Sequence, residues 1–417
     1  CLEGVINMEK SISVIISAFT ADENAMNSSM PLPLHQVCGR SLLHHAIHLA
    51  QQITYTPPSI LVDKNVEQFN DHVSISHVAD VLDMSTTGFS DLQALTHLAE
   101  DADMVILLPA HMPLVTATTL QNIIRFTESQ SLDAAVMSLE TTLSDVSFRN
   151  QLCCFSTKWL NSILINQESQ QSNIQTFHPS DLSELLVVNN RVNLATAEAR
   201  IRLRINENHM RNGITFLDPN QTYIGANVRI GRDTLIYPGN ILEGDTVIGE
   251  SCILYPNNRL KNAVISDRVT IESSVILDST VGQDSTVGPF AYIRPDSTIG
   301  SNVRIGDFVE VKKSVIGNGS KVSHLTYIGD AQLGEDVNVG CGVVCVNYDG
   351  KQKQQVTVGD NAFIGCNVNL VAPVKVEDNA YVAAGSTITE DVPARALAIA
   401  RARQINKEGW VDRREQK

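Results

Sequence analysis

Branched apolar residues recur every six positions through most of the second half of the chain. The register runs through Ile224, Ile230 and Ile236, slips in places, and returns cleanly at Val358 and Ile364. A helix would need a period of 3.6 and a meander would need hairpin turns, and neither is present. A solenoid with three short faces per coil buries one branched residue on each face, which gives this period. We therefore expect residues 214–395 to form a parallel β-helix and residues 396–417 a C-terminal tail.

The repeat is interrupted once by a polar insertion. The stretch VNYDGKQKQQVT between Cys345 and Val358 contains Lys351 and Lys353. A protruding loop with two lysines is a candidate lid or substrate clamp, and the alternative is a surface insertion without a role. After the last repeats, Pro393 is expected to end the coils because it cannot join a regular ladder.

The first half alternates strand-like and helix-like segments instead. Such alternation predicts a mostly parallel sheet flanked by helices, an α/β domain over residues 1–189. A helix rich in Ala, Glu and Arg over residues 190–213, ending at Gly213, is expected to link the halves. The predicted strands are Ser13–Ala18, Ile60–Val62, Met104–Leu108 and Ala134–Ser138, and the predicted helices are Leu42–Gln51, Asp91–Ala99 and Thr118–Thr127.

Composition excludes several classes of protein. Residues 1–190 carry 6 Lys and Arg against 20 Asp and Glu, whereas residues 191–417 carry 25 against 26. An acidic first half repels nucleic acid, so we expect no nucleic-acid partner. No apolar run approaches the ~20 residues that span a bilayer, which predicts a cytoplasmic protein without a membrane partner. The 8 scattered cysteines are expected to be reduced thiols.

Residues 289–410 contain a dense set of motifs. They read PFAYIRP, GDFVEVKKS, GSKVSHLTYIGDAQLGEDVNVG, VNYDGKQK, VAPVKV, AAGSTIT and RARQINKEGW. They closely resemble the acetyltransferase domain of the bifunctional N-acetylglucosamine-1-phosphate uridyltransferase/glucosamine-1-phosphate acetyltransferase family. The resemblance implies a left-handed parallel β-helix assembled as a homotrimer. It also implies that acetyl-CoA and glucosamine 1-phosphate are the small-molecule substrates, feeding UDP-N-acetylglucosamine and cell-wall synthesis.

The residues themselves are suited to this chemistry. Acetyl transfer to a sugar amine needs a base that removes the ammonium proton, and cations for the sugar phosphate. His324 is the only histidine after His209, and histidine is the side chain that ordinarily titrates near neutral pH. We expect His324 to be the base, with Glu310, which shares a strand face with Lys312, orienting its imidazole.

The resemblance carries over to further positions. It implies that glucosamine 1-phosphate is bound by Arg294, Lys312, Tyr327, Asn338 and Lys353, and acetyl-CoA by Cys341, Asn347, Tyr348, Cys366, Ala384 and Arg401. Two positions depart from the family pattern, because Cys341 replaces a small residue such as alanine and Cys366 replaces a serine. The lost hydroxyl at Cys366 is expected to weaken cofactor binding.

The first half resembles the uridyltransferase, a nucleotidyltransferase-like (Rossmann-like) domain of the same family, but departs from it in the chemistry. The family's Gly-rich, Arg-containing loop is replaced by Ala21–Met26, its lysine by Leu32 and its metal-binding aspartate by His111. Only Asn189 matches a metal ligand, and Mg²⁺ needs more than one such oxygen ligand. We therefore expect a degenerate domain, with Mg²⁺ relevant only if uridyl transfer is retained.

Three functions compete at this point. The first is a glucosamine-1-phosphate N-acetyltransferase, with His324 as base. The second is a bifunctional enzyme that also makes UDP-N-acetylglucosamine from UTP. The third is a non-catalytic trimeric scaffold that keeps these residues by descent.

Overall fold

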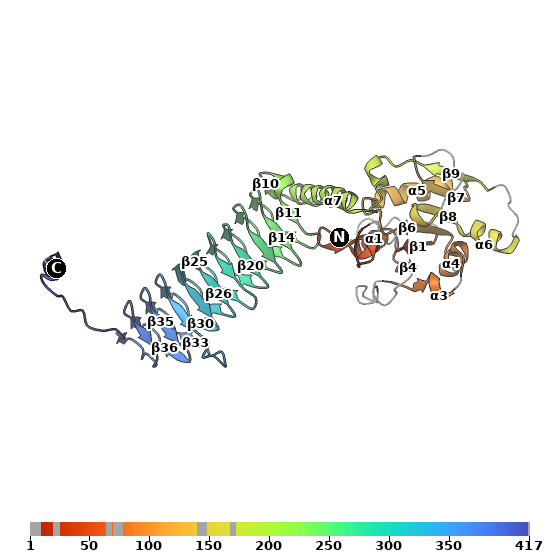
Figure 1. Cartoon of the computed structure of the whole chain (residues 1–417). Helices are drawn as coiled ribbons and strands as arrows, with labels where there is room; N and C mark the ends of the chain where they lie inside the picture. The colour runs from red at the N-terminus through yellow and green to blue at the C-terminus, as the bar shows by residue number, and fades with distance from the viewer. Residues whose placement is uncertain are drawn as a thin grey trace. The chain divides into compact units, whose positions relative to one another are not determined.

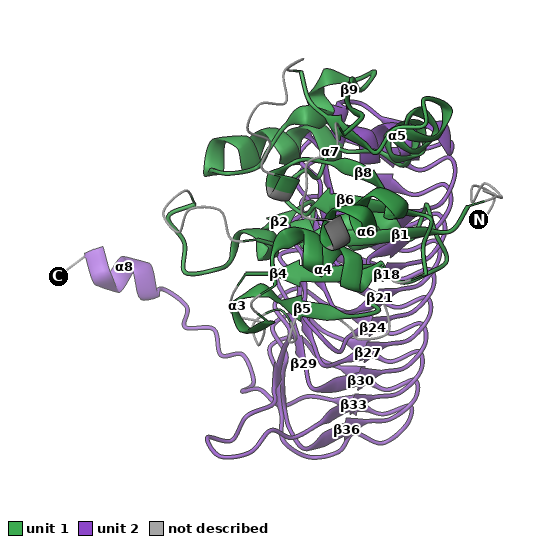
Figure 2. Cartoon of the chain, turned by 90° about the vertical axis from the view of Figure 1, so that its right-hand side faces the viewer, with its two compact units in different colours: residues 1–202 green, residues 203–417 purple. Residues whose placement is uncertain are grey.

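The computed structural model describes residues 10–19, 26–63, 69, 78–87, 89–99, 101–139, 148–166 and 172–415. The chain divides into two compact units, residues 1–202 and 203–417 (Figure 2). The boundary falls inside helix α7 (Arg191–Arg211), the element that the sequence predicts as a linker. Gly213 follows this helix with φ of +93°, a conformation that glycine adopts without strain and that commonly ends helices.

Unit 1 is a seven-stranded sheet with helices on both faces (Figure 1). The strand order is β5-β4-β1-β6-β8-β7-β9, and only β8 runs antiparallel to its neighbours. The four predicted strands and three predicted helices are confirmed, whereas β2, β3, β5, β8, β9, α3 and α6 were not predicted. The strands are β1 (Ile12–Ser17), β2 (Gln36–Val37), β3 (Arg40–Ser41), β4 (Ser59–Val62), β5 (Val81–Asp83), β6 (Met104–Pro109), β7 (Ala134–Met137), β8 (Cys153–Ser156) and β9 (Ile174–Phe177). The helices are α1 (Leu42–Ala50), α3 (Met84–Thr87), α4 (Asp91–Leu98), α5 (Ala117–Ser129) and α6 (Thr157–Asn166).

Two apolar layers, one on each face of the sheet, hold unit 1 together. Ile47 of α1 and Ile124 of α5 pack on one face, and Leu95 of α4 and Leu160 of α6 pack on the other. Burying each such side chain contributes roughly 1.5–3 kcal/mol. The sheet is therefore covered on both sides, as expected for parallel strands.

Unit 2 is a three-sided coil of parallel strands (Figure 1). Sheet I holds β10 (Thr215–Phe216), β13 (Leu235–Ile236), β16 (Ile253–Leu254), β19 (Thr270–Ile271), β22 (Thr286–Val287), β25 (Arg304–Asp307), β28 (Lys321–His324), β31 (Asn338–Val339), β34 (Phe363–Ile364), β37 (Tyr381–Val382) and β39 (Leu397–Ala398). Sheet II holds β11 (Tyr223–Ile224), β14 (Ile241–Glu243), β17 (Arg259–Lys261), β20 (Val275–Leu277), β23 (Tyr292–Ile293), β26 (Glu310–Lys312), β29 (Tyr327–Gly329), β32 (Val344–Val346), β35 (Asn369–Val371) and β38 (Thr387–Ile388). Sheet III holds β12 (Arg229–Ile230), β15 (Val247–Ile248), β18 (Val264–Ile265), β21 (Thr280–Val281), β24 (Thr298–Ile299), β27 (Val315–Ile316), β30 (Ala331–Leu333), β33 (Val356–Val358) and β36 (Val374–Val376).

The six-residue period is confirmed as the source of the coil core. Ile236, Leu254 and Val382, each the second residue of a two-residue strand, point inward and are fully buried. Their partners on successive coils stack in register, so every inward side chain rests on the equivalent side chain of the next coil. With its hexapeptide repeats and parallel sheets, unit 2 is a left-handed parallel β-helix.

Many corners of the coil adopt left-handed backbone, and Asn and Asp often supply it. Asp233, Asn257 and Asn379 are examples, with φ of 57–66°. Bulky residues adopt this conformation at other corners, namely Arg268, Phe290, Phe308, Lys313, Leu325 and Arg395. Phe308 has φ of 55° and Leu325 has φ of 47°, and these two residues directly follow Asp307 and His324.

The coil continues beyond the proline expected to end it. Strand β39 pairs with β37, and Thr387 N still donates to Ala400 O. The prediction that Pro393 ends the coils is therefore wrong, because the proline lies in a turn where its missing N–H costs no ladder bond. Beyond β39, helix α8 (Trp410–Glu415) is exposed. No helix in the described ranges has the length and apolar character needed to span a membrane.

Candidate active site

The candidate base lies where a strand of sheet I turns toward sheet II. Strands β25 and β28 pair in parallel, and Asp307 is the direct register partner of His324. Nδ1 of the imidazole is hydrogen-bonded to Oδ1 of Asp307. The two side chains are 50% and 35% exposed, so the ring is accessible from solvent.

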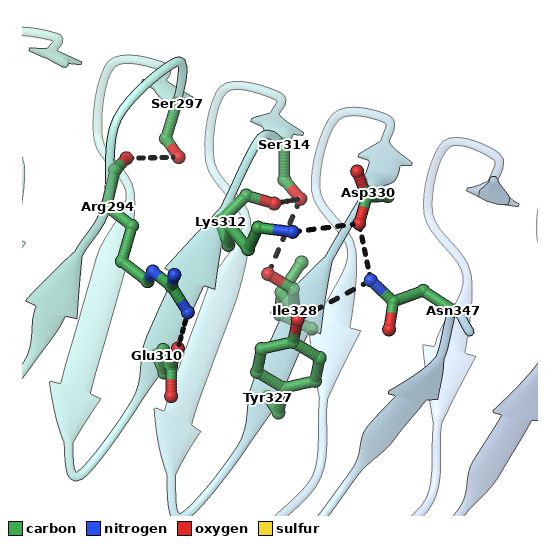
Figure 3. Close-up of polar contacts among 9 residues, drawn as sticks. All are labelled: Arg294, Ser297, Glu310, Lys312, Ser314, Tyr327, Ile328, Asp330 and Asn347. Carbon is green, nitrogen blue, oxygen red and sulfur yellow. Dashed lines mark hydrogen bonds and ion pairs between the residues drawn. The ribbon is translucent and has the colours of Figure 1, made fainter. Parts of the chain in front are cut away.

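The carboxylate that contacts the imidazole differs from the one predicted. Glu310 accepts a hydrogen bond of 2.9 Å from Nη1 of Arg294 (Figure 3), and this bond raises the pKa of Arg294. Glu310 and Lys312 do share one face of β26, as predicted. Alternation along a strand fixes the face but not the neighbouring coil, so the prediction that Glu310 orients His324 is wrong.

A second polar cluster follows sheet II along the coil (Figure 3). Nζ of Lys312 lies 3.4 Å from Oδ2 of Asp330, and both side chains are mostly buried, at 13% and 19% exposed. Asn347 donates to the same Asp330 oxygen, and its Nδ2 lies 3.5 Å from the Tyr327 hydroxyl. Asp330 thus contacts both the predicted phosphate lysine and the predicted coenzyme residue Asn347, and Asn347 in turn contacts the predicted tyrosine.

The polar insertion forms a compact hairpin. Tyr348 and Lys353 pair across it, and Gln354 N donates to Asn347 O over 2.8 Å. The Asp349 carboxylate accepts from two backbone N–H groups of the turn. Contact with Lys312 lowers the pKa of Lys353, whereas contact with Lys353 and then the charge of Asp330 raise the pKa of Lys312. The side-chain amines of Lys312 and Lys353 are therefore neighbours.

Three further predicted residues lie in the same corner column as His324. The register of β28, β31, β34 and β37 aligns His324 with Cys341, Cys366 and Ala384 on successive coils. Backbone bonds of 2.8 Å, Asn367 N to Cys341 O and Gly385 N to Cys366 O, fix this alignment. Cys341 is half-buried and Cys366 is exposed.

Three predicted residues, Asn338, Arg401 and Tyr348, are not part of this corner column within one chain. Asn338 points from sheet I, between Lys321 and Phe363 on the neighbouring strands. Arg401 is exposed in the stretch after β39, with its Cδ near the space beside Gly385. Tyr348 is exposed on the hairpin, and its hydroxyl donates to Gly350 O.

Sequence reasoning missed Asp307 and Asp330. Both were detectable, because coils here are 17 residues long and Asp307 precedes His324 by one coil. The same count relates Asp330 to Asn347. Counting back one coil from each predicted polar residue is therefore the signal that would have found them.

The position that the resemblance assigns to a metal in unit 1 does not fit Mg²⁺. His111 is 3% exposed and neutral, because burial lowers its pKa to about 4. Its Nδ1 has no partner within the described residues, and it presents a nitrogen where Mg²⁺ prefers an anionic oxygen. The Asn189 carbonyl accepts from Asn190 and Asn193 instead. The predicted loop Ala21–Met26 lies outside the described residues except for Met26.

The fold and this site together define the class of the protein, a hexapeptide-repeat transferase joined to a nucleotidyltransferase-like domain. The bacterial transferase hexapeptide (six repeats) family matches residues 278–313 and 355–390. The bifunctional protein GlmU of Clostridium kluyveri is 39% identical over 448 residues, covering 96% of this chain and 98% of the relative. GlmU of Clostridium acetobutylicum is 42% identical over 439 residues, covering 93% and 96%. The chain belongs to the family of the bifunctional protein GlmU.

Among solved structures, a mutant of GDP-perosamine N-acetyltransferase from Caulobacter crescentus, in complex with CoA and GDP-perosamine, is 23% identical to the matched part of this chain. The match covers 28% of this chain and 54% of that one, with a TM-score of 0.26.

Proposed function

We propose that unit 2 transfers an acetyl group from acetyl-CoA to the amine of glucosamine 1-phosphate. The observation that carries this proposal is the half-exposed imidazole of His324 at the end of a sheet I strand, together with the Arg294–Glu310 and Lys312–Asp330 pairs on the adjoining sheet II. Membership of the GlmU family supports it. Acetyl-CoA is a substrate here and not a resident cofactor.

The chemistry follows from these groups. The imidazole Nε2 takes a proton from the sugar ammonium, and the amine nitrogen then forms a bond to the thioester carbonyl carbon. The carbon–sulfur bond breaks, and the CoA sulfur leaves with the proton returned by the imidazolium. The nitrogen loses its second proton through the freed imidazole to solvent, which leaves the neutral amide. Lys312, Lys353 and Arg294 neutralise the sugar phosphate, which holds the amine in position.

We expect the coenzyme to lie along the corner column of Cys341, Cys366 and Ala384, with Asn347, Tyr348 and Arg401 as further contacts. We also propose that the chain assembles as a homotrimer. Outward-facing apolar side chains on the coil support this, among them Val264, Val315 and Tyr381 at 46–47% exposed, because a second copy could cover them. Asn338 would then contribute to a site formed between copies. Sedimentation velocity measures the stoichiometry, and a monomer would contradict this part.

The test of the proposed function is a pair of assays on the full chain. Release of free CoA from acetyl-CoA is followed with glucosamine 1-phosphate as acceptor, and UTP consumption is followed with N-acetylglucosamine 1-phosphate and Mg²⁺. We expect acetylation in the first assay. A chain that leaves the amine unmodified with both substrates in excess would exclude the proposal and favour the scaffold.

Uridyl transfer is the second candidate function, because the relatives are named bifunctional. The buried neutral His111 and the engaged Asn189 argue against it in this chain. We expect no UDP-N-acetylglucosamine from UTP at any Mg²⁺ concentration. Measurable formation of the UDP-sugar would restore the bifunctional assignment.

Metal removal separates the two activities. Every group proposed for acetyl transfer is an organic acid, base or cation of the chain itself. We therefore expect acetyl transfer to keep its rate after dialysis against EDTA, measured as CoA release. A loss that Mg²⁺ restores would contradict this mechanism.

Gly329 is expected to set the position of the Tyr327 ring. A Cβ built at Gly329 would lie 2.3 Å from the Tyr327 hydroxyl oxygen and 2.4 Å from Cζ, so the ring lies over this glycine. We expect Gly329→Ala to displace the ring and raise the KM for glucosamine 1-phosphate by about 10-fold, roughly the value of one lost hydrogen bond. In a Tyr327→Ala background the same change should have little further effect, and full additivity would contradict the coupling.

A further inference from the structure

The contact between Asp307 and His324 is built into the backbone ladder. The two residues are direct partners in neighbouring parallel strands, about 4.8 Å apart along the coil. Leu325 N donates to Asp307 O over 2.9 Å, which fixes the residues on both sides of the contact. The carboxylate and the ring are therefore held one coil apart by main-chain bonds.

The preceding glycine makes this close approach possible. A Cβ at Gly306 would lie 1.9 Å from the backbone oxygen of Ser323, the residue before His324. Only glycine lets the two coils meet here without a shift of main chain. The corner of the coil that carries Asp307 therefore lies directly against the corner that carries His324.

The hydrogen bond between Asp307 and His324 has a defined donor and acceptor. The hydrogen bond from His324 lowers the pKa of Asp307, with a smaller contribution from the backbone N–H of Asp307 itself, so its carboxylate is ionised near neutral pH. An ionised carboxylate can only accept hydrogen bonds, so Nδ1 of the ring must carry the proton. The lone pair then lies on Nε2, the nitrogen with no protein partner among the described residues.

We propose that Asp307 is the positioning residue of the acetyl-transfer site: it holds His324 in the Nδ1–H tautomer with Nε2 available to the sugar ammonium, and it stabilises the imidazolium that forms. This assignment rests on the proposed function and gives Asp307 the role that sequence reasoning gave to Glu310. Because both side chains are partly exposed, the pair adds little to stability, and its effect should fall on turnover.

The experiment compares Asp307→Asn with a matched control. Asparagine keeps the shape but lacks the charge and can present N–H to the ring, so the tautomer is no longer fixed. We expect kcat to fall about 10- to 100-fold, less than the ~10²- to 10⁴-fold loss from removing a general base. The KM values for both substrates should change less than about 3-fold, since Asp307 is not assigned to either substrate. The control is Asp284→Asn, which removes another corner carboxylate, bound to Arg268, and should leave kcat unchanged.

A spectroscopic readout separates this inference from the proposed function. Nitrogen-15 spectra of the full chain labelled at histidine report which ring nitrogen is protonated, and the His324 signals are identified by their loss in His324→Gln. We expect a protonated Nδ1 in the unaltered chain and a shift toward protonated Nε2 in Asp307→Asn. If the unaltered chain transfers no acetyl group, the proposed function fails, but the tautomer comparison still decides the role of Asp307.

Two outcomes overturn the inference. One is an Asp307→Asn variant with unchanged kcat, and the other is an unchanged tautomer in that variant. Circular dichroism checks that the variant is folded. If Asp307→Asn does not fold, Asp307→Glu serves in its place: it keeps the charge and should retain the Nδ1–H tautomer, and a protonated Nε2 there would contradict the assignment.

Discussion

Replacing His324 with alanine is expected to lower kcat for acetyl transfer by about 10²- to 10⁴-fold, the usual contribution of a general base. His209 lies in helix α7, and His324 is the only histidine after it, so the coil itself offers no second imidazole to take its place. The ring is 50% exposed and outside the apolar core, and the thermal unfolding midpoint should therefore change little.

The matched variant for this test is Lys321→Ala, which removes a polar side chain from the same strand without touching the proposed machinery. It should retain the parental rate. If His324→Ala also retains it, the imidazole is not the base and the scaffold function gains support. CoA release under saturating substrates measures both variants.

Replacing Lys312 with methionine is expected to raise the KM for glucosamine 1-phosphate more than the same change at Lys353. Each lysine contributes a charge-assisted hydrogen bond to the phosphate, about 1.5–3 kcal/mol, or roughly 10- to 100-fold in binding. Lys312→Met also leaves the carboxylate of Asp330, 19% exposed, facing the phosphate without its partner. This added repulsion should place Lys312→Met at or above the upper end of that range.

A second substitution tests the cause. Adding Asp330→Asn to Lys312→Met removes the unpaired charge, and part of the lost affinity should return. Adding Asp330→Asn to Lys353→Met should restore no affinity for the sugar phosphate. In Lys353→Met, Lys312 already neutralises Asp330, so the second substitution removes no unpaired charge. Equal KM values for the two single variants would argue that Asp330 does not influence the phosphate site.

The sequence predicted the coil well because one physical requirement repeats at every turn. Each face must bury one branched residue, and this requirement fixes Ile236, Leu254 and Val382 as inward-facing without knowledge of their neighbours. The end of the coil was predicted poorly, because Pro393 sits in a turn where its effect on the ladder is small.

The site was only partly predictable for a related reason. Lys312 and Lys353 could be named from charge and from the interruption of the repeat, and the structure brings them together. The choice of Glu310 over Asp307 failed because contacts across coils depend on the number of residues per turn of the coil. This number varies from 16 to 18 where loops are short, so neighbours cannot be assigned from strand alternation alone.

The position of the base within the stack has a consequence for fluctuations of the folded chain. In a coil, each turn contacts only the turns beside it, so opening proceeds from an end and moves inward. Four strands of sheet I lie between His324 and the C-terminal end, and six lie on the other side. Amide exchange should accordingly be fastest in the terminal turns and slowest near the middle. The corner that carries His324 lies among the middle turns, so fraying of the ends should not reach it.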